Sequence, residues 1–341
     1  MCEMAAPSRF ALHMVPRCLL ALSFTVCSGL NAQTLNVRER WATKGSPQAV
    51  ELAAVNGMAE DRSGNIWIAD PVNKLLVRVD STGRHPRVTA RQGDGPGEVA
   101  VPMIMARHPS GGVAVYDAGH GSVEVFGPAG RFDRRIPVPV PFRNPRGFAF
   151  LPSGEFFLSG GVQSSGHAIH RFSPGGRLSY SWHAIPRTRN VRAGEMVAGG
   201  PVVVLPDGAL LFSQSAPHRI LRYAAAGGSP RTIAADPKLV PAIGDDFIRE
   251  SGGRRTFKWD YTRSAGVFRM PDGRILNIVL NEAENHTVWE VYRPDGKLQV
   301  RTRVLRAYQP WGMTRNGDVL ASYLDPDTDE AVAARLTLTV G

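Results

Sequence analysis

Cysteine is almost absent from this 341-residue chain: there are three, and all of them, Cys2, Cys18 and Cys27, lie within the first 32 residues. If that segment is removed, the rest of the chain has no thiol, which excludes a disulfide framework, a cysteine nucleophile and a thiolate metal site. Residues 33–341 are numerous enough to bury a substantial core, so folding does not require covalent cross-links.

Long hydrophobic runs are also lacking. The apolar stretch near the N-terminus, Cys18–Val26, has about half of the roughly 20 residues that a membrane-spanning helix needs. Arg9 and Arg17 precede this stretch, and small or polar residues lead from it to Ala32. This order is typical of a signal peptide, so we expect cleavage of residues 1–32 near Ala32. The mature chain is then expected to be secreted or periplasmic, without a transmembrane segment.

Two other interpretations of the N-terminal segment remain open. The apolar stretch could act as an uncleaved anchor, for which it is short. Alternatively, the chain could be a lipoprotein acylated at Cys27, although Val26 stands where such a signal has a small side chain.

The charge of the chain is strongly basic. Its formal net charge is +10, and it would be +9 without residues 1–32, which contain two arginines and one glutamate. Such a charge can attract polysaccharides, lipid headgroups or nucleic acid. The arginines are scattered, however, and the nearest approach to a cluster is Arg187, Arg189 and Arg192. We therefore expect a solvated basic surface, and export argues against nucleic acid as a partner.

The motifs of several enzyme classes are missing. No Gly-x-Ser-x-Gly nucleophile elbow occurs, and helical periodicity is lacking throughout. The segment Gly95–Glu98 is not a phosphate-binding loop, because no Lys-Ser or Lys-Thr follows it and the next element has the pattern of a strand. We expect a tight crossing between two repeats there, with the Glu98 carboxylate accepting backbone N–H groups. Whether the chain is an enzyme stays open.

One pattern recurs six times: Ser, Asp or Asn, then glycine, then an apolar strand. It suits a tight hairpin, because glycine accepts positive φ and the short polar side chain can bond its own backbone. The glycines are 47, 43, 54, 65 and 44 residues apart, a period typical of propeller blades with two insertions. They are Gly64, Gly111, Gly154, Gly208, Gly273 and Gly317.

A second set of turns, about 20 residues further on, is expected to join the third and fourth strands of most blades; it contains Gly83, Gly130, Gly176, Gly228 and Gly296. The sixth repeat ends after its third strand, Ala331–Val340. Leu35–Trp41, ahead of the first repeat, has the length and pattern of an outer strand. Residues 33–341 are therefore predicted to form an all-β, six-bladed propeller of four-stranded antiparallel blades, closed by the N-terminal strand.

A further pattern runs from the crossing after the first repeat through the second: Asp94–Glu98, Val101–Pro102, Gly111, Tyr116–Asp117, Val123–Phe126 and Gly130. Together these residues resemble the repeat of NHL-type six-bladed propellers. The resemblance implies a structural repeat whose blades present loops that bind protein, peptide, nucleic acid or small molecules. The later repeats lack the aspartate found at Asp70 and Asp117; their equivalent positions are Gly160, Gln214, Val279 and Tyr323.

Propeller ligands usually meet the loops that lead into the innermost strands, because these loops converge on one face near the axis. These loops contain the candidate ligand-binding residues Asn56, Met103, Arg146, Arg263 and Trp311. Asn144–Gly147 and Gln309–Gly312 share a polar-Pro-bulky-Gly pattern that would present Arg146 and Trp311 towards the axis. Alternatively, Trp311 is packed between blades, since large aromatic residues mostly serve burial.

Histidines between the second and third strands are candidate ligands of Zn or another transition metal: His120, His170, His218 and His286. If they converged at the channel mouth they could activate water, as in the metal-dependent lyases that this chain would then resemble. Their offsets from the repeat glycines vary from 9 to 16 residues (His167 included), so solvated or capping roles are the alternative. Asp325 and Asp327 lie in an acidic segment that could bind Ca, but it lacks the EF-hand pattern and could equally be a solvated turn.

The sequence thus favours an exported scaffold that binds a protein, peptide, small-molecule or carbohydrate ligand near the central channel. No cofactor is firmly implied. A metal-dependent lyase or lactonase is the alternative function, and we expect a monomer.

Overall fold

The computed structural model describes residues 33–44, 51–188, 191–243, 248–251, 254–257 and 261–341. The expected signal peptide, with its cleavage site and all three cysteines, lies outside the described residues, and so does Arg189. Within the described ranges, no helix is long and apolar enough to cross a membrane.

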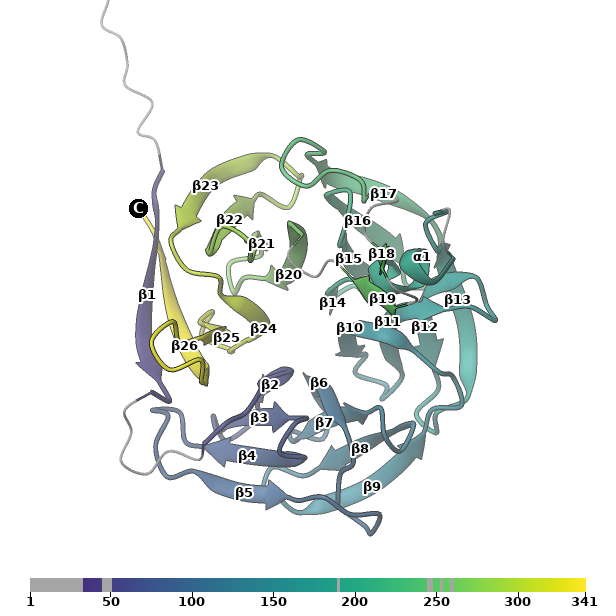
Figure 1. The fold of residues 1–341 in the computed structure, drawn as a ribbon, viewed down its shortest axis with the longest axis vertical. Helices are drawn as coiled ribbons and strands as arrows, with labels where there is room; N and C mark the ends of the chain where they lie inside the picture. The colour runs from purple at the N-terminus through teal and green to yellow at the C-terminus, as the bar shows by residue number, and fades with distance from the viewer. Residues whose placement is uncertain (1–32, 45–50, 189–190, 244–247, 252–253, 258–260) are drawn as a thin grey trace, which may run out of the picture. The chain divides into compact units, whose positions relative to one another are not determined.

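Six four-stranded antiparallel sheets surround a central axis as the blades of a ring (Figure 1). Blade 1 contains β2 (Gly57–Glu60), β3 (Ile66–Asp70), β4 (Leu75–Val79) and β5 (Arg87–Ala90). Blade 2 contains β6 (Pro102–Arg107), β7 (Val113–Asp117), β8 (Ser122–Phe126) and β9 (Phe132–Pro137). Blade 3 contains β10 (Arg143–Phe150), β11 (Phe156–Val162), β12 (His167–Phe172) and β13 (Leu178–Ala184).

Blade 4 contains β14 (Val202–Val204), β15 (Leu210–Gln214), β16 (Arg219–Ala224) and β17 (Gly227–Ala235). Blade 5 contains β20 (Arg263–Arg269), β21 (Ile275–Asn281), β22 (His286–Tyr292) and β23 (Leu298–Val304). Blade 6 contains β24 (Gln309–Met313), β25 (Val319–Leu324), β26 (Ala331–Val340) and β1 (Leu35–Ala42). In each blade the first-named strand lies nearest the axis, so the predicted six-bladed propeller is confirmed (Figure 1).

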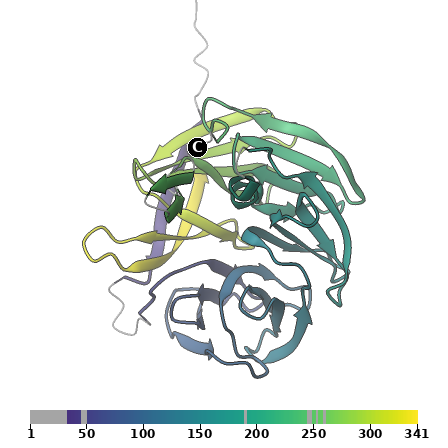
Figure 2. The ribbon, with the colours of Figure 1, turned by 45° about the vertical axis from the view of Figure 1, so that its right-hand side comes forward.

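Blade 6 is closed by the strand from the start of the propeller. β1 and β26 run side by side in both views although they lie far apart in the sequence (Figure 1, Figure 2). Their antiparallel register runs from Leu35 opposite Val340 to Ala42 opposite Ala334. This pairing confirms the predicted closure and leaves no blade of the ring with an unfilled fourth position.

The repeated glycines occupy the hairpin turns for which they were predicted. The six glycines before the second strands have φ between 78° and 97°, a region that side chains with a Cβ avoid. At the crossing from blade 1 to blade 2, the Glu98 carboxylate accepts the backbone N–H of Gly95 at 2.7 Å, as expected. Local turn chemistry therefore fixes where each blade begins.

Apolar side chains fill the space between neighbouring blades. Trp67 of blade 1 is fully buried, and its ring centroid lies 5.4 Å from that of Phe126 in blade 2. Burial of one such side chain stabilises the fold by about 1.5–3 kcal/mol. The hydrophobic core therefore lies at the junctions between blades and does not fill the central axis.

Glycines in the inner strands let adjacent blades approach closely. A Cβ at Gly147 would lie 2.5 Å from the carbonyl oxygen of Gly200, and a Cβ at Gly312 would lie 2.8 Å from that of Met58. The pairing of each inner strand shifts register just before its glycine, between Arg143 and Gly147 and between Pro310 and Gly312. Arg146 and Trp311 lie in these irregular segments, where a bulge turns the side chain out of the regular alternation.

Two insertions account for the long intervals of 54 and 65 residues between repeat glycines. The first contains α1 (Val191–Ala198), which the sequence pattern did not predict, and the second contains the hairpin of β18 (Ile248–Ser251) and β19 (Arg254–Phe257). α1 has only 8 residues, about two turns, which is too short a stretch for a visible helical period. Its buried residues are Ala193, Gly194, Glu195, Val197 and Ala198.

Candidate functional site

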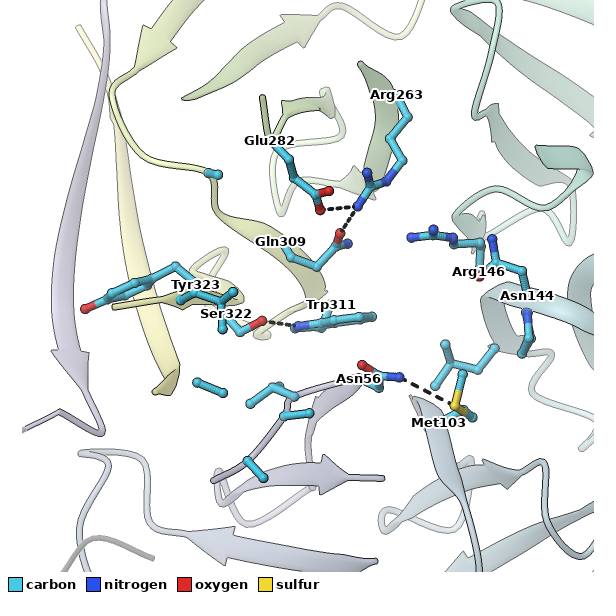
Figure 3. Close-up of a pocket in the computed structure, with 18 of the residues that line it drawn as sticks. Asn56, Met103, Asn144, Arg146, Arg263, Glu282, Gln309, Trp311, Ser322 and Tyr323 are labelled. Carbon is cyan, nitrogen blue, oxygen red and sulfur yellow. Dashed lines mark hydrogen bonds and ion pairs between the residues drawn. The ribbon is translucent and has the colours of Figure 1, made fainter. Parts of the chain in front are cut away.

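A cavity lies on the ring axis, where the innermost strands begin. Its volume is about 660 Å³, and side chains from five blades line it. We call it the axial cavity. It brings together all five residues that the sequence predicted for ligand binding, Asn56, Met103, Arg146, Arg263 and Trp311 (Figure 3). Blade 4 contributes none of its described lining residues, because Gly199 and Gly200 lead into its inner strand.

Arg146 reaches into the axial cavity from blade 3. The preceding Asn144 has φ of 46°, and its amide donates to the carbonyl of Met196 in α1 at 2.8 Å, which anchors this loop. A Cβ at Gly199 would lie 3.4 Å from Cγ of Arg146, so glycine leaves room for the stem of the arginine. Figure 3 shows the guanidinium pointing towards the middle of the cavity.

The guanidinium of Arg146 makes no hydrogen bond or ion pair with another described side chain or backbone group. Burial and the positive charge of Arg263 lower the pKa of Arg146 to about 10, against smaller opposing effects of Tyr261 and Glu282. Arg146 therefore remains a cation at neutral pH. A partly buried cation without a protein partner is stabilised when a ligand or water satisfies it.

Arg263 lies beside Arg146 but is held in an ion pair. Its Nη2 donates to Glu282 Oε1 at 2.7 Å and to Gln309 Oε1 at 3.0 Å (Figure 3). Its guanidinium also lies 5.7 Å from the ring centroid of Tyr261. Arg263 is only 4% exposed, and Glu282 balances its charge. Its guanidinium is therefore held in place as part of the cavity wall.

Trp311 lies between the axial cavity and the rest of the channel. Its indole N–H donates to Ser322 Oγ at 2.8 Å, so the polar group of the side chain has a partner and the apolar ring face can contact a ligand. The ring packs partly on the apolar cluster shared by blades 6 and 1, and it also borders a second cavity of about 520 Å³ at the opposite mouth. Trp311 thus combines the two predicted alternatives, since it is packed against a blade junction and also faces the channel.

The side of the axial cavity opposite Arg146 is apolar. Blade 6 supplies Tyr323, Leu324 and Ala331, and the loop before β2 supplies Ala53–Val55. In Figure 3 the side chain of Tyr323 points away from the middle of the cavity, and its ring is covered by Arg306, whose guanidinium lies 4.3 Å from the ring centroid. Because blades 3 and 6 are three positions apart in a ring of six, the cation and this apolar wall face each other across the axis.

Four predicted metal-binding histidines lie in four different blades and have separate partners. His170 bonds Ser181 Oγ at 2.8 Å, His218 bonds Glu290 at 2.9 Å, and His286 approaches Arg303 at 3.1 Å. His120 lies 2.9 Å from Asp117 and 3.1 Å from Asp94. None of these histidines lines the axial cavity, as far as its described residues show.

One group of three possible metal ligands occurs in the described part of the chain: Asp117, His120 and Glu124, with ligand atoms within 4.8 Å of one another. The oxygens of Asp117 already accept three backbone N–H groups at 2.7–3.0 Å. Arg135 donates to Glu124 at 2.6 Å and so places a cation beside the group. These contacts are those of a structural clamp, and they oppose the binding of a second cation.

Asp325 and Asp327 are also supplied with a cation by the protein. The ammonium of Lys44 contacts Asp325 and lies 3.7 Å from Asp327. Asp325 accepts the backbone N–H of Asp327 at 3.0 Å, which closes a tight turn.

The polar and aromatic residues of the site that were not predicted include Glu282, Ser322 and Tyr323. Ser322 and Tyr323 lie near the end of the second strand of blade 6, and Glu282 follows the second strand of blade 5, nine residues past its repeat glycine. A polar or aromatic residue at the end of the second strand could have indicated a cavity residue. Such residues also occur in exposed turns, however, so the pattern does not distinguish the two.

No family model and no curated protein matches the chain. Solved structures do match. A member of the DUF4221 family from Bacteroides vulgatus has 11% identity and a TM-score of 0.61, over 91% of this chain and 99% of that one. Virginiamycin B lyase from Staphylococcus aureus has 12% identity and a TM-score of 0.53, over 90% and 100% of the two chains. A gluconolactonase from Xanthomonas campestris has 11% identity and a TM-score of 0.53, over 84% and 87%. At such identities these similarities show that the chain shares the propeller fold, and the fold alone.

Proposed function

We propose that this chain is an exported binding protein whose ligand occupies the axial cavity. The observation that carries the proposal is the guanidinium of Arg146, which points into the axial cavity and has no partner among the described residues. Side chains from five blades converge on the same space, as expected for a ligand site on a rigid scaffold. Its volume, about 660 Å³, is typical of cavities for small molecules.

Export is supported by the N-terminal sequence. Arg9 and Arg17, the short apolar stretch and the small residues up to Ala32 form the order of a signal peptide. A propeller with no cysteine after residue 32 is also suited to an oxidising compartment.

The arrangement of the cavity favours binding over metal-dependent lyase or lactonase chemistry. Glu282 is the one carboxylate among the described lining residues, and no histidine is found among them. Glu282 is already bonded to Arg263. Metal activation of water generally needs about three protein ligands around an open position, which this lining does not supply.

The proposal is tested by an unbiased screen of metabolite and peptide libraries against the purified protein, read by thermal unfolding and confirmed by calorimetry. We expect at least one ligand that raises Tm, and we expect Arg146→Gln to weaken it by about tenfold or more. Arg231→Gln is the matched control, because Arg231 is exposed on the outer strand β17 of blade 4. Ligands whose affinity is equal in the wild type and in R146Q would place binding elsewhere and overturn the proposal.

A further inference from the structure

The described residues that line the axial cavity carry a surplus of one positive charge. Those with a charge at neutral pH are Arg146, Arg263 and Glu282. The ion pair between Arg263 and Glu282, at 2.7 Å, cancels two of these charges. Arg146 is left uncompensated, so a ligand with one negative charge would balance the site and a dianion would exceed it.

The donor geometry of Arg146 selects among anions. A guanidinium is planar and presents parallel N–H groups, which match the two oxygens of a carboxylate in a bidentate pair. The amide side chains of Asn56, Asn144 and Gln309 also line the cavity, although those of Asn144 and Gln309 are engaged with Met196 and Arg263. The free donor of highest charge is therefore Arg146.

The opposite side of the cavity selects the other end of the ligand. Leu324 and Ala331 of blade 6, with Ala53–Val55 of blade 1, offer apolar surface and no charge. The Trp311 ring lies between this wall and Arg146 in Figure 3, with its indole N–H satisfied by Ser322. A flat apolar body could thus stack on Trp311 while it contacts the wall.

We infer that the ligand of the axial cavity is an amphipathic monocarboxylate, with its carboxylate on Arg146 and its apolar, ring-containing body against Trp311 and the wall of blades 6 and 1. This inference rests on the proposed function and adds the chemical class and orientation of the ligand. The carboxylate points to blade 3, and the apolar end points across the axis.

The test uses matched probes in calorimetric titrations of the purified protein: 4-phenylbutyrate, 4-phenylbutanamide, 4-phenylbutylamine and acetate. We expect the Kd of 4-phenylbutyrate to be at least about tenfold lower than that of the amide, because the charge-assisted pair is lost in the amide. The amine and acetate should bind more weakly still, since one repels Arg146 and the other has no apolar body.

Variants separate the two halves of the inference. Arg146→Gln should abolish the preference for the acid over the amide, and Arg146→Lys should keep the preference for a negative charge in weakened form. Trp311→Leu should weaken the acid and the amide alike. Arg231→Gln, on the outer strand of blade 4, should change none of these values. Circular dichroism and Tm show that each variant is folded.

The outcomes distinguish this inference from the proposed function. If the amide binds as tightly as the acid, or if R146Q retains the preference, the monocarboxylate inference is overturned while ligand binding stands. If no acid binds but the unbiased screen finds a neutral or cationic ligand that depends on the axial cavity, the inference is again overturned and the binding function remains. If the screen also yields nothing, both fail.

Discussion

His218 and Glu290 face each other across the junction between blades 4 and 5, with imidazole Nε2 2.9 Å from carboxylate Oε2 and both side chains fully buried. Asn277 donates to the same oxygen at 3.0 Å. Arg301 binds the other oxygen through two N–H groups, at 3.0 and 2.6 Å. Glu290 is therefore the centre of a polar network that joins two blades.

The first prediction concerns this carboxylate. Burial alone would raise the pKa of Glu290, but the hydrogen bond and charge of His218, with Arg301 and Asn277, outweigh burial and lower it. Because the pKa of the folded state lies below that of the unfolded chain, the stabilisation is present above about pH 4.5 and is lost as pH falls further. Glu290→Gln should cost about 3 kcal/mol in the free energy of unfolding at pH 7, and less at pH 3, in urea denaturation.

Glu330→Gln is the control for Glu290→Gln, since Glu330 is exposed in the turn before β26. It should change stability by less than about 0.5 kcal/mol at either pH. An equal loss at pH 7 and pH 3 in E290Q would show that the charge of Glu290 is not what stabilises the junction.

A second prediction concerns His170, which bonds Ser181 within blade 3. Burial lowers the pKa of His170 to about 4, more than its hydrogen bonds raise it. Between about pH 6.5 and 4 the unfolded chain therefore binds a proton that the folded protein does not. As pH falls through this window, the protein should lose about 3 kcal/mol in the free energy of unfolding. His170→Gln should reduce this dependence without abolishing it, because burial also lowers the pKa of His183 to about 4. His85→Asn, at an exposed turn, is the control and should leave the dependence unchanged.

The six-bladed ring could be predicted from the sequence because the glycine turns that mark each blade depend only on neighbouring residues. Gly64 and its five counterparts adopt positive φ within single hairpins, which requires no knowledge of distant contacts. The closing strand could also be predicted, because the sixth repeat has only three strands and Leu35–Trp41 has the pattern of the missing fourth one. The prediction that Arg146 and Trp311 face the axis followed from the polar-Pro-bulky-Gly pattern that their two loops share, and both residues line the cavity.

The remaining features depend on distances between blades, which spacing in the sequence does not encode. His218 and His286 have similar places in their repeats, but His218 meets Glu290 at a buried junction and His286 meets Arg303 near the surface. The hydrogen bond from Arg263 to Gln309 likewise joins two blades, 5 and 6, through residues that are 46 apart in the sequence. α1 was missed because two helical turns give too short a period to detect.

A third prediction concerns the aspartate that the first two repeats share. Asp117 is fully buried and accepts the backbone N–H groups of Ala100, Val101 and Gly119. Asp117→Asn should cost about 2–3 kcal/mol, because an amide nitrogen would then face backbone donors. Asp94→Asn is the matched control: it contacts the same His120 but is fully exposed, and it should have no measurable effect on chemical denaturation. Equal effects of the two changes would contradict the role of Asp117 as a clamp.

The last prediction compares two arginines that contact one carboxylate at the closure of the ring. Arg335 of β26 is 3% exposed and donates to Asp318 at 2.7 Å and to the Ser81 carbonyl of blade 1 at 2.9 Å. Arg40 of β1 contacts the same Asp318 at 3.5 Å, but its side chain is 56% exposed.

Arg335→Leu should cost about 3–5 kcal/mol in the free energy of unfolding, because it leaves a nearly buried carboxylate with only a distant partner. Arg40→Gln should cost less than about 1 kcal/mol, since solvent screens the exposed pair. If R335L unfolds at the same denaturant concentration as R40Q, then the join between blades 6 and 1 is held by strand pairing and apolar packing, and its buried ion pair contributes nothing measurable.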